Sequence, residues 1–231
     1  MASQTPKELF DLGVKSNKAK DFIQAKKYFE KACNLNYGGG CGALGDLYDD
    51  GKGVEKNLIK AAQFYSKACD LKDGSGCFNA GISYGYVRGV EKNLTKAAYF
   101  YSKACDLNNG SGCGALGDLY DDGQGVEKDL TKAAQFYSKA CDLNDKFGCS
   151  ILGAMQYIGK GVVKNEKQAV EKFEKACKLG KEEACEMVTY KGLCELGHKE
   201  ACEIFSLEVL CESSDQKACD MSYDKKKALS F

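Results

Sequence analysis

The residues best suited to chemistry are the 14 cysteines, which fall into seven pairs with seven residues between the members of each pair. The pairs are Cys33 with Cys41, Cys69 with Cys77, Cys105 with Cys113, Cys141 with Cys149, Cys177 with Cys185, Cys194 with Cys202 and Cys211 with Cys219. On one continuous helix, cysteines at this spacing would lie about 12 Å apart, beyond the roughly 7 Å between Cα atoms that a disulfide spans. We therefore predict that the chain turns within each pair, and that each disulfide joins the end of one helix to the start of the next.

Glycines between the paired cysteines are candidates for these turns, because glycine adopts positive φ without steric cost. We expect that role for Gly74, Gly76, Gly110, Gly112, Gly148 and Gly180.

Zinc is the competing chemistry for paired cysteines. The sequence contains no C-x2-C knuckle and a single histidine, His198, so we expect no metal site and no cofactor. Matched cysteines in this number persist as disulfides in an oxidising compartment, which predicts a secreted or periplasmic protein. The first residues, MASQTPKELF, lack an apolar signal segment, and we interpret the sequence as a mature form.

Two S-x-x-K motifs, Ser214 with Lys217 and Ser222 with Lys225, place a lysine base one helical turn from a serine nucleophile. The serine and lysine content of the chain gives this number of matches by chance. We therefore treat these residues only as weak catalytic candidates.

Charge and hydropathy argue against a nucleic acid partner and against a membrane span. The 33 basic residues balance 33 acidic ones, so there is no basic field for a nucleic acid. No stretch is apolar enough to span a membrane. We expect a monomer.

The elements that position the cysteines repeat every 36 residues from Cys33 to Cys177. The pattern of each repeat predicts two helices joined by a G-x-G-V loop. The second helix has an N-cap candidate at one phase, namely Asp21, Asn57, Asn93, Asp129 and Asn165. In the first helix, a glycine recurs as Gly45, Gly81, Gly117 and Gly153. We expect the two helices of a repeat to cross closely at this glycine, with an aromatic pair of the second helix, such as Phe64 and Tyr65, packed over it.

Three segments follow from this pattern. Residues 1–36 predict an N-terminal capping hairpin, starting at the capping box Thr5-Pro6-Lys7-Glu8. Residues 37–180 hold the repeats. In residues 181–231 the cysteine step shortens to 17, which predicts a tail of short single helices over 183–194, 200–211 and 216–229. We expect one continuous solenoid domain.

The pattern L-G-x-L-Y-x-x-G-x-G-V at Leu44–Val54, followed by K-A-x-x-x-Y-x-K-A at Lys60–Ala68, resembles the Sel-like repeat, a relative of the tetratricopeptide repeat. With a C-x7-C pair in each unit, it is similar to the Helicobacter cysteine-rich protein family. The resemblance covers about residues 6–190, and the tail departs from it. It implies an all-α, right-handed α/α solenoid of disulfide-stapled helix hairpins.

The resemblance also implies two functions. One is an exported scaffold that binds a protein or extended peptide, with a host protein as the partner. The other is a weak penicillin-binding or β-lactamase activity on a cell-wall or β-lactam ligand. A serine β-lactamase also needs S-D-N and K-T-G, and neither occurs here. We therefore rank the scaffold first.

Solenoids of helix pairs line their concave face with the first helix of each unit. The positions that would face a ligand are Asp46, Asp50, Asn79, Ile82, Tyr86, Asp118 and Asp122, with Ile151, Ala154 and Ile158 in the fourth repeat. We predict that the aspartates form an acidic stripe for an extended peptide with basic groups.

Overall fold

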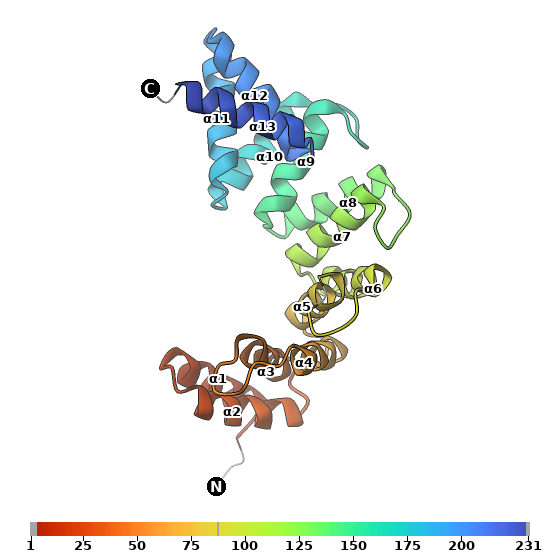
Figure 1. Cartoon of the computed structure of the whole chain (residues 1–231), viewed down its shortest axis with the longest axis vertical. Helices are drawn as coiled ribbons and strands as arrows, with labels where there is room; N and C mark the ends of the chain where they lie inside the picture. Colours follow the sequence, from red (N-terminus) through yellow and green to blue (C-terminus); the bar gives the residue numbers. More distant parts are fainter. Residues whose placement is uncertain (1–3, 87, 230–231) are drawn as a thin grey trace. The chain divides into compact units, whose positions relative to one another are not determined.

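The structure is a computed structural model that describes residues 4–86 and 88–229, which form thirteen α-helices and no strand (Figure 1). The outer ends of the predicted first and last segments, residues 1–3 and 230–231, lie outside this description. The helices are α1 Pro6–Lys18, α2 Phe22–Asn34, α3 Gly38–Asp50, α4 Leu58–Asp70, α5 Gly74–Gly85, α6 Leu94–Asp106, α7 Gly110–Asp122, α8 Leu130–Asp142, α9 Lys146–Ile158, α10 Glu166–Lys178, α11 Glu182–Glu195, α12 Lys199–Glu212 and α13 Gln216–Leu229.

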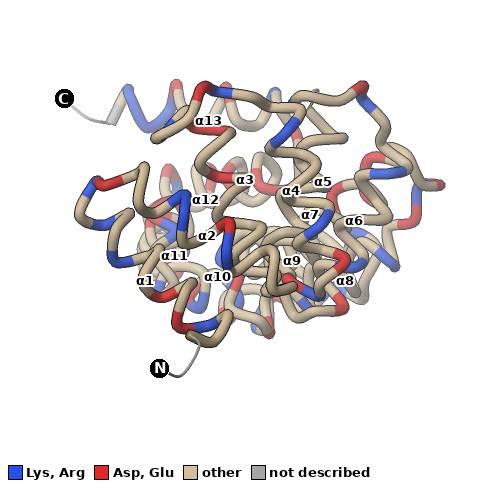
Figure 2. The backbone as a smooth tube through the Cα atoms, turned by 90° about the horizontal axis from the view of Figure 1, so that it is seen from below, with Lys and Arg blue, Asp and Glu red and all other residues tan. Residues whose placement is uncertain are grey.

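The chain divides into two compact units, Met1–Lys128 with α1 to α7 and Asp129–Phe231 with α8 to α13. In both units, each helix packs against the next one in the chain. In the first unit, α3 also packs against α5, and α5 against α7, so the first helices of successive repeats are neighbours. Residues of both charge signs are interspersed along the tube (Figure 2).

Local chemistry sets the start of each second helix. The side chains of Asp21, Asn57, Asn93, Asp129 and Asn165 each accept a hydrogen bond from a backbone N–H in the first turn, as predicted. Such a cap stabilises a helix by about 1 kcal/mol over alanine. Thr5 and Glu8 form the predicted capping box of α1.

The seven disulfides join the pairs predicted from the spacing, with Cα–Cα distances of 4.3 to 4.7 Å. They connect Cys33 with Cys41, Cys69 with Cys77, Cys105 with Cys113, Cys141 with Cys149, Cys177 with Cys185, Cys194 with Cys202 and Cys211 with Cys219. The first member of each pair lies in the last turn of one helix, and the second lies in the first turn of the next.

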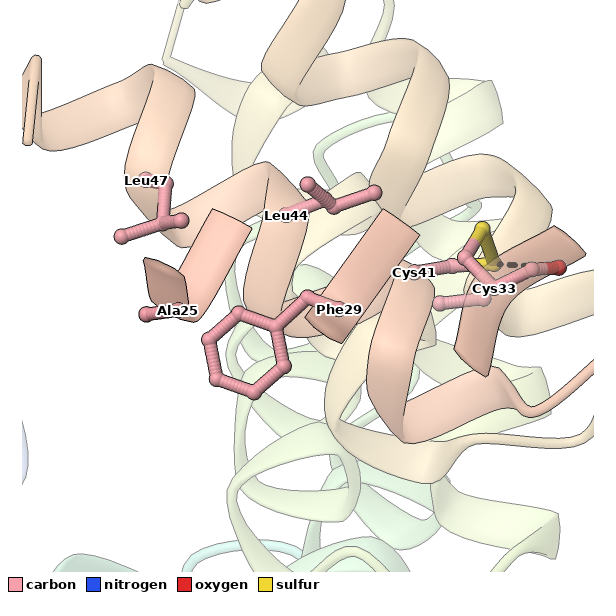
Figure 3. Close-up of a cluster of buried hydrophobic side chains, with 7 residues drawn as sticks. Ala25, Phe29, Cys33, Cys41, Leu44 and Leu47 are labelled. Atoms are coloured by element: carbon pink, nitrogen blue, oxygen red, sulfur yellow. Dashed lines mark hydrogen bonds between the residues drawn. A yellow bond between two sulfur atoms is a disulfide. The ribbon is translucent and has the colours of Figure 1, made fainter. Parts of the chain in front are cut away.

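Each bridge contributes to the fold at a helix junction. The bridge of Cys33 with Cys41 belongs to a buried cluster with Ala25, Phe29 and Leu44 (Figure 3). In the chain-entropy description, closing such a loop stabilises the folded state by roughly 2.5 kcal/mol. Helices α11 and α12 carry a bridge near both ends, as expected for short helices that are marginal alone.

The prediction that glycines make these turns is wrong for five of the six. Between the paired cysteines, positive φ occurs at Asn36, Lys72, Asn108 and Asn144 and, of the six predicted glycines, only at Gly180; Gly197 and Ser214 adopt it in the last two turns. The other five glycines lie inside the next helix, ahead of its cysteine.

Their role is close helix approach. A Cβ atom at Gly76, next to Cys77, would lie 2.4 Å from the Cβ atom of Ala68. One at Gly112, next to Cys113, would lie 2.5 Å from that of Ala104. Glycine therefore lets the two helices come near enough for the adjacent disulfide to close.

Close crossing also explains the glycines of the first helices. A Cβ atom at Gly45 would lie 2.5 Å from the Tyr65 ring, and one at Gly81 would lie 2.4 Å from the Tyr101 ring. The two aromatic residues have different contacts: Tyr65 lies over Gly45, whereas Phe64 stacks on Tyr48 with ring centroids 5.5 Å apart. The predicted aromatic filling is confirmed for the tyrosine of the pair.

The three tail helices occur within one residue of their predicted bounds, but their packing was not foreseen. Helix α12 packs against α9 as well as against its neighbours α11 and α13. Its Phe205 lies in one buried cluster with Ala154, Phe173 and Met187. An ion pair of 2.7 Å between the mostly buried side chains of Lys181 and Glu212 joins the start of α11 to the end of α12.

Candidate partner-binding surface

The predicted ligand positions of the first unit lie on α3, α5 and α7, with Tyr86 at the C-cap of α5. We call this set the first-helix surface; its members are Asp46, Asp50, Asn79, Ile82, Tyr86, Asp118 and Asp122. The four aspartates and Tyr86 are exposed, whereas Asn79 and Ile82 are half-buried. Tyr86 is 73% exposed, so its ring is available to a partner.

Asp46 is held in place by the second helix of its own repeat. The Tyr65 hydroxyl donates a hydrogen bond of 2.9 Å to the Asp46 carboxylate. The pKa of Asp46 is raised, first because packing removes water from the carboxyl group, and further because of the negative charges of Asp50, Asp49 and Asp73. The hydrogen bond from Tyr65 offsets part of this rise.

A raised carboxyl pKa predicts a pH-dependent loss of stability. The folded state binds the Asp46 proton more tightly than the unfolded chain, so this group destabilises the fold once pH rises above its folded pKa. Asp46→Asn keeps an acceptor for Tyr65 and removes the charge. We expect the melting temperature of the variant, relative to the wild type, to increase between about pH 3 and about pH 7. A difference that stays constant or falls over this range contradicts the assigned direction.

Asp50 and its neighbour Asp49 are engaged differently. Asp50 forms an exposed ion pair of 2.8 Å with Lys52. Asp49 accepts two hydrogen bonds, of 2.8 and 2.9 Å, from the guanidinium group of Arg88, and its side chain is only 18% exposed. Asp49 with Asp50, and Asp121 with Asp122, stand at helix ends before Gly51 and Gly123, a position that suggests fully solvated side chains. That expectation is wrong for Asp49. It is also wrong for Asp121, which is buried.

The Asp49–Arg88 pair was the main feature missed from the sequence. Arg88 is the single arginine of the chain, and it reaches from the loop after α5 to α3 of the preceding repeat. Together with Tyr65, Asn79, Ile82 and Ser83, the pair lines a small cavity of about 30 Å³. This volume suits a water molecule rather than a substrate.

The second and third repeats continue the surface. The pKa of Tyr101 is raised, first by burial and then by the nearby Tyr86 and Asp118, so these two side chains lie close to the same ring. Asp118 and Asp122 are exposed at the phase of Asp46 and Asp50. The surface therefore runs from the aspartates of α3, past Tyr86 at the end of α5, to the aspartates of α7.

The fourth repeat departs from the prediction. Ala154, at the phase of Asp46, is fully buried, and Tyr157, at the phase of Asp49, contacts Phe205 of α12 with ring centroids 5.2 Å apart. Phe173 replaces the tyrosine that holds Asp46, so the Tyr–Asp hydrogen bond becomes an apolar contact here. Helix α12 therefore covers Ala154, which we expected to face a ligand, whereas Ile151 is half-buried and Ile158 is exposed.

The weak catalytic candidates are not arranged as a nucleophile and its base. Ser222 is buried and donates a hydrogen bond to Glu208, whereas Lys225 pairs with Glu203. Ser214 and Lys217 are exposed in the turn before α13 and in its first turn. Among residues 4–86 and 88–229, no three His, Cys, Asp or Glu side chains are grouped to hold a metal ion. No helix within these ranges is both long and apolar enough to cross a membrane.

Comparison with known proteins supports the repeat assignment. HcpC of Helicobacter pylori strain 26695 is 66% identical over 56 residues, which are 24% of this chain and 19% of HcpC. Beta-lactamase HcpA of strain J99 is 54% identical over 57 residues, 25% of this chain and 23% of HcpA. The chain thus matches about a fifth of the length of these curated relatives.

Two solved structures share the fold over most of the chain. The protective antigen c5321 of uropathogenic Escherichia coli, which displays an SLR fold, aligns with a TM-score of 0.74 and 27% identity over 93% of this chain and 47% of c5321. A Sel1 repeat protein from Oxalobacter formigenes aligns with a TM-score of 0.70 and 29% identity over 78% of this chain and 73% of that protein.

The Sel1 repeat pattern itself matches residues 9–37, 40–73, 74–109, 111–145 and 147–181. These matches cover well over half of the chain, and the first of them lies in the segment predicted as the N-terminal cap. The chain belongs to the Sel1 repeat family.

Proposed function

We propose that this protein is an exported, disulfide-stapled scaffold that binds a polypeptide carrying basic groups through the first-helix surface. The observation that carries the proposal is the recurrence of exposed carboxylates at one phase, Asp46 with Asp50 and Asp118 with Asp122, around the exposed ring of Tyr86. The negative charges of Asp50, Asp49 and Asp73 contribute, after burial, to the raised pKa of Asp46, even though Lys52 and Arg88 pair with Asp50 and Asp49. Lysine or arginine side chains of a partner would relieve this repulsion.

An oxidising location is part of the same proposal. Seven disulfides and no free cysteine among the described residues suit a secreted or periplasmic protein. A host protein as the partner follows from the resemblance to exported Helicobacter proteins. We also propose that the segments 1–36, 37–180 and 181–231 serve as cap, repeats and tail.

The hydrolase alternative rests on the names of the Helicobacter relatives alone. In this chain, Ser222 is inaccessible and its hydroxyl group is bound to Glu208. No contact described above activates a serine next to an open pocket. We therefore assign no β-lactamase activity to the chain.

Charge reversal tests the proposed binding mode. The probe is an extended lysine-rich peptide, with a glutamate-rich peptide of equal length as its control. We expect Asp46→Lys with Asp118→Lys to weaken binding of the basic peptide at least about tenfold and to flatten its salt dependence. Glu55→Lys with Asp106→Lys, both exposed outside the surface, makes the same change in net charge and is expected to have little effect.

Equal loss of affinity in both double variants would mean that only net charge matters. Unchanged affinity in the first variant would show that the peptide does not use these aspartates. Either result contradicts the proposal.

A further inference from the structure

The seven disulfides differ in how far they are shielded from solvent. All eight cysteines from Cys33 to Cys149 are buried, with exposed fractions of at most 3%. The six cysteines from Cys177 to Cys219, with Cys185 among them, are all half-buried. A thiolate can attack a disulfide only where it can reach a sulfur atom, so the three bridges of the tail are the reactive ones by access.

One of these bridges also borders a groove. An open depression of about 390 Å³ lies between α12 and α13 and is lined by Cys202, Glu203, Ser206, Leu207, Met221 and Lys225. Leu207 and Met221 give the groove apolar walls, and the Lys225 ammonium group at the rim offsets the charge of its partner Glu203, so that a small thiolate is not repelled. The four buried bridges become reachable only when the repeats open.

We propose that the Cys194–Cys202 disulfide is a thiol–disulfide exchange site, and that a dithiol enters it through this groove at Cys202. One thiolate of the dithiol attacks the Cys202 sulfur, the Cys194–Cys202 bond breaks, and Cys194 leaves as a thiolate. The second thiolate of the reagent then attacks the mixed disulfide and releases Cys202. The dithiol is oxidised to a disulfide by two electrons, and the two cysteines take up two protons from water.

Reduction at this site acts on the helix that covers the fourth repeat. The bridge closes the turn between α11 and α12, and α12 places Phe205 and Val209 in the cluster with Ala154 and Phe173. Without the bridge, the opened state of α12 gains the entropy of an unrestricted loop, and its population rises by about 70-fold. The opened state exposes the face of α9 that corresponds to the first-helix surface. This inference stands independently of what binds to that surface.

Timed reduction of the full oxidised chain with dithiothreitol, followed by alkylation and peptide mapping, tests the proposal. We expect Cys194 and Cys202 to be labelled first, at a rate about tenfold or more above that of the buried pairs. Amide hydrogen exchange in residues 199–212 should then accelerate while that in α3 to α6 stays unchanged. First labelling of any other pair, or reduction of Cys194–Cys202 without faster exchange in α12, would overturn the proposal.

A charge variant in the groove tests the route of attack. Lys225→Gln removes the cation at the rim and is expected to slow the first labelling about two- to threefold, because the attacking thiolate is negative. Lys217→Gln removes an exposed lysine from α13 outside the groove and should leave the rate unchanged. Equal rates for the two variants would show that the reagent does not pass through the groove.

Discussion

Gly125→Ala is expected to destabilise the first unit by about 2–5 kcal/mol. Gly125 has φ of 72°, a left-handed conformation that costs a residue with a side chain roughly 1–2 kcal/mol. Its Cβ atom would also lie 2.4 Å from the Leu94 carbonyl carbon at the start of α6, and overpacking of this kind costs about 1–3 kcal/mol. Because the obstruction is backbone, no side-chain rotation relieves it.

Urea denaturation of the variant measures this loss, and Gly85→Ala is the matched control. A Cβ atom at Gly85 would meet its nearest neighbour, the Tyr101 hydroxyl, at an ordinary 3.5 Å. Since alanine favours a helix over glycine, the control is expected to gain about 0.5–1 kcal/mol. Equal stability of the two variants would mean that the G-x-G-V loop does not pack against the preceding repeat in this way.

Phe205→Ala is expected to cost about 3–5 kcal/mol and to release α12 from α9, the usual range for a buried phenylalanine. Phe205 is 2% exposed and makes edge contacts with the rings of Tyr157 and Phe173, at centroid distances of 5.2 and 6.3 Å. Its removal leaves a cavity in the cluster that joins α9 to the tail.

The control for this variant is Tyr223→Ala on α13. Tyr223 is an aromatic residue of the same unit that is 67% exposed, so we expect a change below about 0.5 kcal/mol. Hydrogen exchange should accelerate in α9 and α12 of the Phe205 variant only. Comparable losses in both variants would contradict the packing of α12 on α9.

The repeat frame was predictable because it depends on local chemistry. A fixed cysteine spacing, the side-chain caps such as Asn57 and the glycine under each aromatic ring recur with the 36-residue period, and each is readable from a few neighbouring residues. The bounds of the tail helices followed from the 17-residue step for the same reason.

The features that were missed depend on contacts between residues far apart in the sequence. Arg88 and Asp49 are 39 residues apart in the sequence. The only sequence signal for their pairing is that Arg88 is the single arginine of the chain. The packing of α12 on α9 follows from the loss of the long loop after α11. The sequence carried one signal for it: Phe173 and Ala154 stand in the fourth repeat where the first has Tyr65 and Asp46. The turn glycines were misplaced because a glycine near a helix end serves equally for positive φ and for close approach.

The central claim is that a partner lies along α3, α5 and α7, and mapping a bound probe by NMR tests it most directly. A paramagnetic tag on the lysine-rich peptide broadens the amide signals of the residues nearest to it. We predict the strongest broadening near Asn79, Tyr86 and Asp118, and little near Tyr99, which is exposed on the second helix of the same repeat. Broadening centred on Tyr99 and the other second helices would contradict the account.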